Sequence, residues 1–216
     1  GGEIMDLPRS TVVNRFVPKE KFYSKTTINA RLRQLFTDEI EKITWKNKIS
    51  PDTLNITAGD YAELQVFEIA LKSAEVSSAV LKHIDTFIPY PIVFLVKKPG
   101  AFKVAISFKE STAKNNDVMK VDSYFETGWQ QDVSLELKGR SVDEIYKHYL
   151  YQIAPQLERI SNTSAKVAIE TNKEREKLQK QVDAMNRQIV NEPSIAKKQE
   201  LARERFVLEQ QIENMV

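Results

Sequence analysis

Two acids and a lysine in the first third of the chain have the residue types of a metal-dependent nuclease. Asp52 follows a Ser-Pro break, and Glu68 opens the run Glu-Ile-Ala-Leu-Lys that ends at Lys72. Restriction-type nucleases place an acid at a strand end and Glu-x-Lys on the next strand, so that carboxylates hold Mg²⁺ and the lysine orients water. Here Ala70 stands at the lysine position, and Lys72 lies one strand repeat, about 6.6 Å, further on. Such a displacement costs orders of magnitude in rate, so the sequence favours a protein that is not an enzyme. A degenerate Mg²⁺-dependent nuclease using Asp52, Glu68 and Lys72 remains the alternative.

Other catalytic and cofactor sites lack their usual residues. The chain has no cysteine, only two histidines (His83 and His148), and six glycines. It contains neither a phosphate-binding loop of the G-x-x-x-x-G-K-[ST] type nor a G-x-S-x-G nucleophile motif. We therefore expect no metal site and no cofactor.

A basic strip for nucleic acid is suggested weakly. The net charge is +2, but residues 1–50 hold ten lysines and arginines against six acids. Residues 43–50 alternate apolar and polar side chains, as a half-buried strand does, and its lysines share the polar face. The simpler interpretation is that these lysines lie on a solvent-exposed strand face and bind nothing. The sharper interpretation is weak or indirect contact with a DNA backbone, through Arg15, Lys19, Lys21, Lys46 and Lys48.

The elements that would position these residues form a mixed α/β body over residues 26–154, preceded by an N-terminal arm over residues 1–25. Residues 1–4 resemble an expression-tag remnant, which would put the native start at Met5. Helical spacing predicts helices over 26–41, 75–88 and 142–153, the last capped by Ser141 and Glu144. Strand patterns are predicted over 43–50, 54–57, 64–72, 91–98, 102–110, 121–129 and 133–138. We expect hairpins to join the fourth strand to the fifth and the sixth to the seventh.

Residues 155–216 differ from the preceding residues in composition and in apolar spacing, and they predict two helices. The segment has no glycine, and Asn191–Ser194 interrupts it at Pro193. A seam with spacings of three and four runs on both sides of the break, and Arg205 is its charged position. The apolar partner-binding residues of the seam are Leu178, Val182, Met185, Ile189, Leu201, Leu208 and Ile212. The fold class is therefore α+β, a small mixed sheet with flanking helices followed by a C-terminal antiparallel helical hairpin of the coiled-coil type. Such short arms are marginal alone, so we expect these residues to bind a partner protein or a second copy in a homodimer.

No apolar run approaches the roughly 20 residues that span a bilayer. We expect a cytoplasmic protein without membrane contact.

Four stretches carry a family resemblance: LPRSTVVNRFVPKEKFY (7–23), ITWKNKISPDTLNI (43–56), IPYPIVFLV (88–96) and SYFETGW (123–129). Over about residues 5–215 the chain resembles an uncharacterised bacterial and archaeal family, domain of unknown function number 4391. The resemblance implies genes beside type III-like DNA methyltransferases and helicases. It implies membership of a restriction-modification or phage-defence cluster. We expect a non-enzymatic accessory subunit of such a complex, with a helicase or methyltransferase as partner. The family has no established catalytic residues, so none is carried over.

Overall fold

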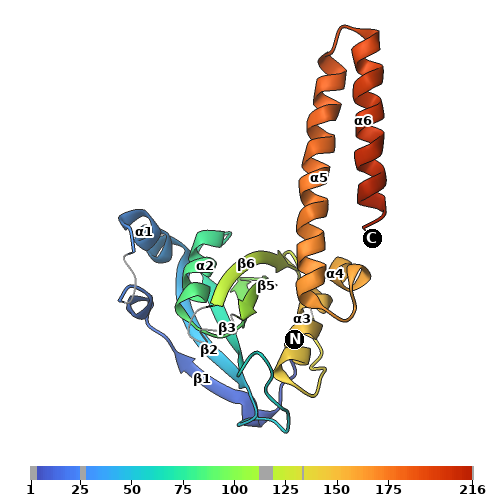
Figure 1. Cartoon of the computed structure of the whole chain (residues 1–216). Helices are drawn as coiled ribbons and strands as arrows, with labels where there is room; N and C mark the ends of the chain where they lie inside the picture. The colour runs from blue at the N-terminus through green and yellow to red at the C-terminus, as the bar shows by residue number, and fades with distance from the viewer. Residues whose placement is uncertain (1–3, 25–27, 112–118, 133, 216) are drawn as a thin grey trace. The chain divides into compact units, whose positions relative to one another are not determined.

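The computed structural model describes residues 4–24, 28–111, 119–132 and 134–215. The chain divides into two compact units, which we call the body (Gly1–Ala154) and the tail (Pro155–Val216). The body is mixed α+β, as predicted, and the tail is helical (Figure 1). Among the described residues, no helix is both long and apolar enough to cross a membrane.

A six-stranded sheet forms the body, and its strands lie side by side in the order in which the chain makes them. They are β1 (Val12–Phe16), β2 (Ile40–Ile49), β3 (Leu64–Leu71), β4 (Ile92–Lys98), β5 (Ala101–Ser111) and β6 (Met119–Glu126). All neighbours are antiparallel except β3 and β4, which are parallel. A parallel pair needs a crossover, and helix α2 (Ser78–Phe87) supplies it. The turn between β4 and β5 uses Gly100 at φ +78°, where a side chain would be strained.

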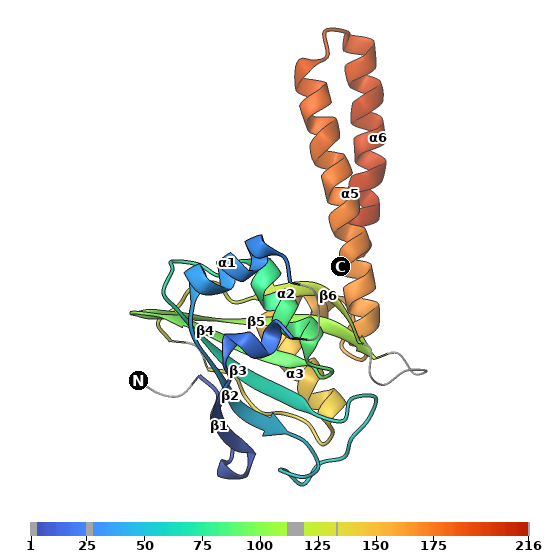
Figure 2. The ribbon, with the colours of Figure 1, turned by 90° about the vertical axis from the view of Figure 1, so that its left-hand side faces the viewer.

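One face of the sheet is covered by α2, by α1 (Ala30–Glu39) and by the 3₁₀ turn η2 (Lys19–Phe22), as Figure 2 shows. Helix α1 begins later than predicted because the Asn29 side chain caps it, accepting the Leu32 N–H at 2.7 Å. The core under these helices contains alternate residues of the central strands, which therefore all point the same way: Ile43, Phe67, Ile69, Leu71, Ile92, Phe94, Val96 and Ala105.

Helix α3 (Val142–Ile153) packs against β5 and β6. Val104 and Ile106 of β5 are buried and alternate with the residues that face α2. The predicted cap is present, with the Glu144 N–H donating to Ser141 Oγ at 3.1 Å. The Glu144 carboxylate accepts the backbone N–H of Arg140 at 2.8 Å.

Two predicted strands and one hairpin are wrong. Residues 54–57 make a single isolated bridge, from Thr57 to Ser141, because the chain first turns tightly after β2. In the segment 133–138, Leu135 bridges to Met5, and residue 133 lies outside the described residues. Strand β6 pairs with β5 instead, since the edge of β5 is the neighbour available to it. Strand β1 was not predicted and comes from the N-terminal arm.

The tail contains α4 (Pro155–Ile160), α5 (Ala165–Asn191) and α6 (Ile195–Glu213). Helices α5 and α6 pack side by side, joined by the turn at 192–194 (Figure 1). Ser164 and Ser194 cap their N-termini, accepting the N–H groups of Val167 and Lys197. We call this pair of helices the α5–α6 hairpin.

Candidate functional site

The three residues of the nuclease alternative lie apart along the sheet. Asp52 follows the end of β2, where Ile49 pairs with Leu64 of β3. Glu68 lies four residues beyond Leu64 on β3, about 13 Å along the strand, and Lys72 lies four residues beyond Glu68. The structure therefore does not bring Asp52, Glu68 and Lys72 together. Across the ranges that the structure describes, no three His, Asp or Glu side chains gather as a metal site would need.

Glu68 instead lies in a hollow of about 480 Å³ in the body. The hollow, which we call the Glu68 hollow, is lined by one or more residues from each of β2, β3, β4 and β5, including Lys46, Glu68, Leu95 and Phe102. The segment before β1 closes one side and contributes Arg9. Because β3 alternates, Glu68 points away from the core that its neighbours enter.

The lysines of β2 that could bind nucleic acid contact acids. Lys46 Nζ lies 3.8 Å from a Glu68 oxygen, and Lys48 Nζ lies 3.5 Å from Asp52 and 4.0 Å from Glu63. A shift in strand register between Trp45 and Asn47 turns Lys46 toward the Glu68 hollow.

The predicted basic residues of the N-terminal segment are placed separately. The Arg15 guanidinium lies over the Trp45 ring, 5.7 Å from its centroid. Burial, and then the nearby charge of Lys72, lower the pKa of Lys19. Lys21 is exposed on η2. The basic residues of the expected nucleic-acid strip therefore lie at separate places, which include the Glu68 hollow, the edge strand β1 and the turn η2.

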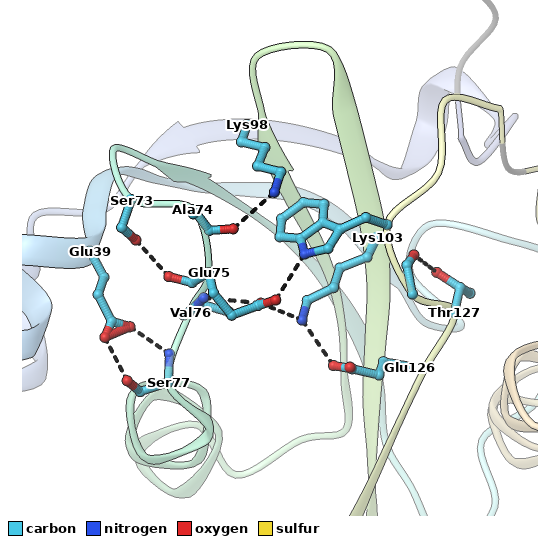
Figure 3. A network of polar contacts seen from close by, with 12 residues as sticks. Glu39, Ser73, Ala74, Glu75, Val76, Ser77, Lys98, Lys103, Glu126 and Thr127 are labelled. Atoms are coloured by element: carbon cyan, nitrogen blue, oxygen red, sulfur yellow. Dashed lines mark hydrogen bonds and ion pairs between the residues drawn. The ribbon is translucent and has the colours of Figure 1, made fainter.

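Sequence reasoning missed a polar network around Glu75, between the end of β3 and the β4–β5 hairpin (Figure 3). Lys103 Nζ donates to Glu75 at 2.6 Å and to Glu126 at 3.0 Å, and the Trp129 indole N–H donates to Glu75 at 2.8 Å. Lys98 Nζ lies 4.1 Å from the centroid of the Trp129 ring. A lysine on the buried face of a strand, as Lys103 is, was the signal that could have revealed this network.

The lowered pKa of the Glu75 carboxylate predicts that the protein becomes less stable in acid. Partial desolvation raises its pKa, but hydrogen bonds from Lys103, Trp129 and the Val76 N–H outweigh this and hold the pKa at about 2, against 4.5 normally. Because the folded-state pKa is lowered, the stabilisation is present above pH 4.5 and is lost as the pH falls toward 2. Glu75 is 57% exposed, so solvent screening limits it to about 1 kcal/mol.

Urea unfolding at several pH values checks this prediction. Glu75→Gln should be less stable than wild type near neutral pH, and the difference should shrink in acid. The exposed Glu41→Gln provides the control and should follow wild type throughout. A constant difference between Glu75→Gln and wild type at all pH values would contradict the assignment.

A buried ion pair lies between α2 and β5. Asp85 and Lys109 are 0% and 1% exposed, and the Lys109 Nζ lies 2.7 Å from the carboxylate. Lys109 also donates to the carbonyls of Ile88 and Tyr90, each at 2.6 Å. Burial lowers the pKa of Lys109, and the Asp85 charge opposes that effect.

Hydroxyl groups complete this network. Ser107 Oγ donates to Asp85, and the Tyr124 hydroxyl donates to the same oxygen at 2.7 Å. The Tyr146 hydroxyl of α3 donates to the Ser107 carbonyl at 2.5 Å and accepts the Lys109 N–H at 2.8 Å. The charges of the pair join α2, β5 and β6, and α3 contacts the backbone of the same β5 residues.

The α5–α6 hairpin presents a candidate protein interface. Of the predicted partner-binding residues, Leu178 and Val182 are buried, whereas the others are half-buried: Met185, Ile189, Leu201, Leu208 and Ile212. Among the described residues of α6 none is buried. Ile195 and Phe206 are 74% and 60% exposed, and with Ala202 they follow spacings of seven and four, which place them on one helix face. We call these three residues the α6 outer stripe.

One match to known proteins was found, and it covers residues of both the body and the tail. A family model described as "Domain of unknown function (DUF4391)" matches residues 5–212. This match confirms the resemblance noted in the sequence motifs. No curated protein and no solved structure matches the chain.

Proposed function

The chain belongs to the DUF4391 family, a family of unknown function, and we propose that it is a non-enzymatic accessory subunit that docks on a partner protein through the α5–α6 hairpin. The α6 outer stripe, in which Ile195 and Phe206 are exposed and Ala202 is half-buried, is the observation that carries this proposal. Exposed apolar side chains that continue along one helix face are typical of a surface that another element covers. The spacing of seven and four fits a second helix, which would pack its own apolar residues between Ile195, Ala202 and Phe206.

The partner proposed is a helix of a DNA helicase or methyltransferase in a restriction-modification or phage-defence complex. The sequence motifs support this choice, because the family resemblance that they carry implies genes beside such enzymes. Within the hairpin, the Arg205 guanidinium donates to Asn186 of α5 at 2.9 Å. This contact would fix the register of the coiled coil and leave the outer stripe of α6 to the partner.

Co-purification tests the proposal with the full-length chain and the neighbouring helicase or methyltransferase, expressed together. Phe206→Glu should weaken capture roughly tenfold or more, because it replaces the largest apolar side chain of the stripe by a charge. The matched control is Gln211→Glu, which adds the same charge to an exposed position on another face of α6. The control should capture the partner as wild type does.

Two outcomes would overturn this choice of partner. Equal capture by Phe206→Glu and Gln211→Glu would remove the outer stripe from the interface. A wild-type dimer in light scattering that Phe206→Glu converts to a monomer would show that a second copy covers the stripe.

A further inference from the structure

The Glu68 hollow carries more positive than negative charge. Lys97 Nζ lies 2.7 Å from one Glu68 oxygen, and Lys46 Nζ lies 3.8 Å from the other. Arg9 is exposed and lines the same hollow. Arg9 and Lys46 line the hollow together with the one carboxylate, and Lys97 pairs with that carboxylate from beside the hollow, so the cations outnumber the acid and favour an anionic ligand.

Apolar side chains line part of the hollow. Leu95 and Phe102 come from neighbouring strands, Leu7 from the segment before β1 and Val12 from the start of β1. At about 480 Å³ the hollow has the size of a small-molecule site. An inorganic anion would leave these apolar side chains unused, and a purely apolar ligand would leave the charges unused.

We propose that the Glu68 hollow binds a ribonucleotide. The phosphate would lie against Arg9 and Lys46, the two cations that line the hollow, because guanidinium and ammonium groups form charge-assisted hydrogen bonds with phosphate oxygens. The Glu68 carboxylate only accepts hydrogen bonds, so it suits the ribose hydroxyls, which donate them. The planar base would cover Leu95 and the Phe102 ring. This site lies in the body and does not depend on docking of the hairpin.

Isothermal titration calorimetry of the full-length protein tests the site, with AMP as the probe. We expect AMP to bind with a Kd below about 1 mM. Adenosine lacks the phosphate, and 2′-deoxy-AMP lacks the hydroxyl assigned to Glu68, so both should bind several-fold more weakly. An oligoribonucleotide with a 5′-phosphate distinguishes a strand end from a free nucleotide: tighter binding than AMP assigns the same site to a strand end.

Variants locate the ligand. Arg9→Gln should weaken AMP binding roughly tenfold, whereas Arg31→Gln, an equal change at an exposed position of α1, should leave it unchanged. Glu68→Ala removes both acceptor oxygens and should abolish the preference for AMP over 2′-deoxy-AMP. Val12 is 46% exposed, so Val12→Trp should fill the hollow and block binding without loss of thermal stability.

The proposal fails if wild type binds no AMP at millimolar concentration. It also fails if adenosine binds as tightly as AMP, or if Arg9→Gln and Val12→Trp both bind as wild type does while folded.

Discussion

Replacing Lys109 by methionine is expected to lower the free energy of unfolding by about 3–5 kcal/mol. Methionine can fill the space of the lysine stem, so the loss is mainly electrostatic. It leaves the fully buried Asp85 carboxylate without its cation, while Ser107 and Tyr124 still donate to it. Breaking one half of a buried pair costs more than the pair itself contributes. Urea unfolding followed by circular dichroism measures the change.

The double variant Asp85→Asn/Lys109→Met isolates the charge. With both charges absent, we expect it to be about 2 kcal/mol more stable than Lys109→Met alone. Lys82→Met, an equal substitution at an exposed position of α2, should stay within about 0.5 kcal/mol of wild type. If Lys109→Met costs less than Lys82→Met, the ion pair does not hold the body together.

Phe36→Ala is expected to cost about 3–5 kcal/mol, the second large effect. Phe36 is fully buried in α1, with its ring centroid 6.4 Å from that of Phe22, 5.7 Å from Tyr23 and 5.7 Å from His83. Alanine would leave a cavity at the junction of η2, α1 and α2, and each of these elements would lose contacts.

Phe16→Ala is the matched control, because Phe16 is 57% exposed on β1. It should cost less than about 1 kcal/mol. Limited proteolysis adds a local measurement, since Phe36→Ala should expose the chain around η2 to cleavage earlier than Phe16→Ala does. Equal stability losses for the two variants would contradict the assigned core.

Much of the fold followed from periodicity. The strands at β2, β3, β4 and β5 and the helices α2 and α3 have strong apolar patterns, because each buries a face against a covering element. Strand β1 has no such pattern: four of its five residues are exposed, and Asn14 has a φ of +48°. The segment 133–138 alternates, but alternation cannot say which edge a segment will meet.

The sites depended on contacts between distant positions, which periodicity does not report. Asp85 and Lys109 are 24 residues apart and meet only because α2 lies over β5. Glu68 was identified from the sequence, yet its surroundings require the five strands β1 to β5 and the segment before β1 to converge. The α6 outer stripe could have been predicted from the sequence, because Ile195, Ala202 and Phe206 share a helical spacing.

The strand order has a consequence for how the body folds. Because the strands pair in the order in which they occur in the chain, each new strand docks on the one made just before it. Such short-range pairing keeps the entropy of loop closure low and favours rapid folding. During synthesis the sheet can grow by one strand at a time from the N-terminal side, with the crossover through α2 as a slower step. Helix α3 follows all six strands in the chain, so we expect its Tyr146 hydroxyl to complete the network around Lys109 after the strands have paired.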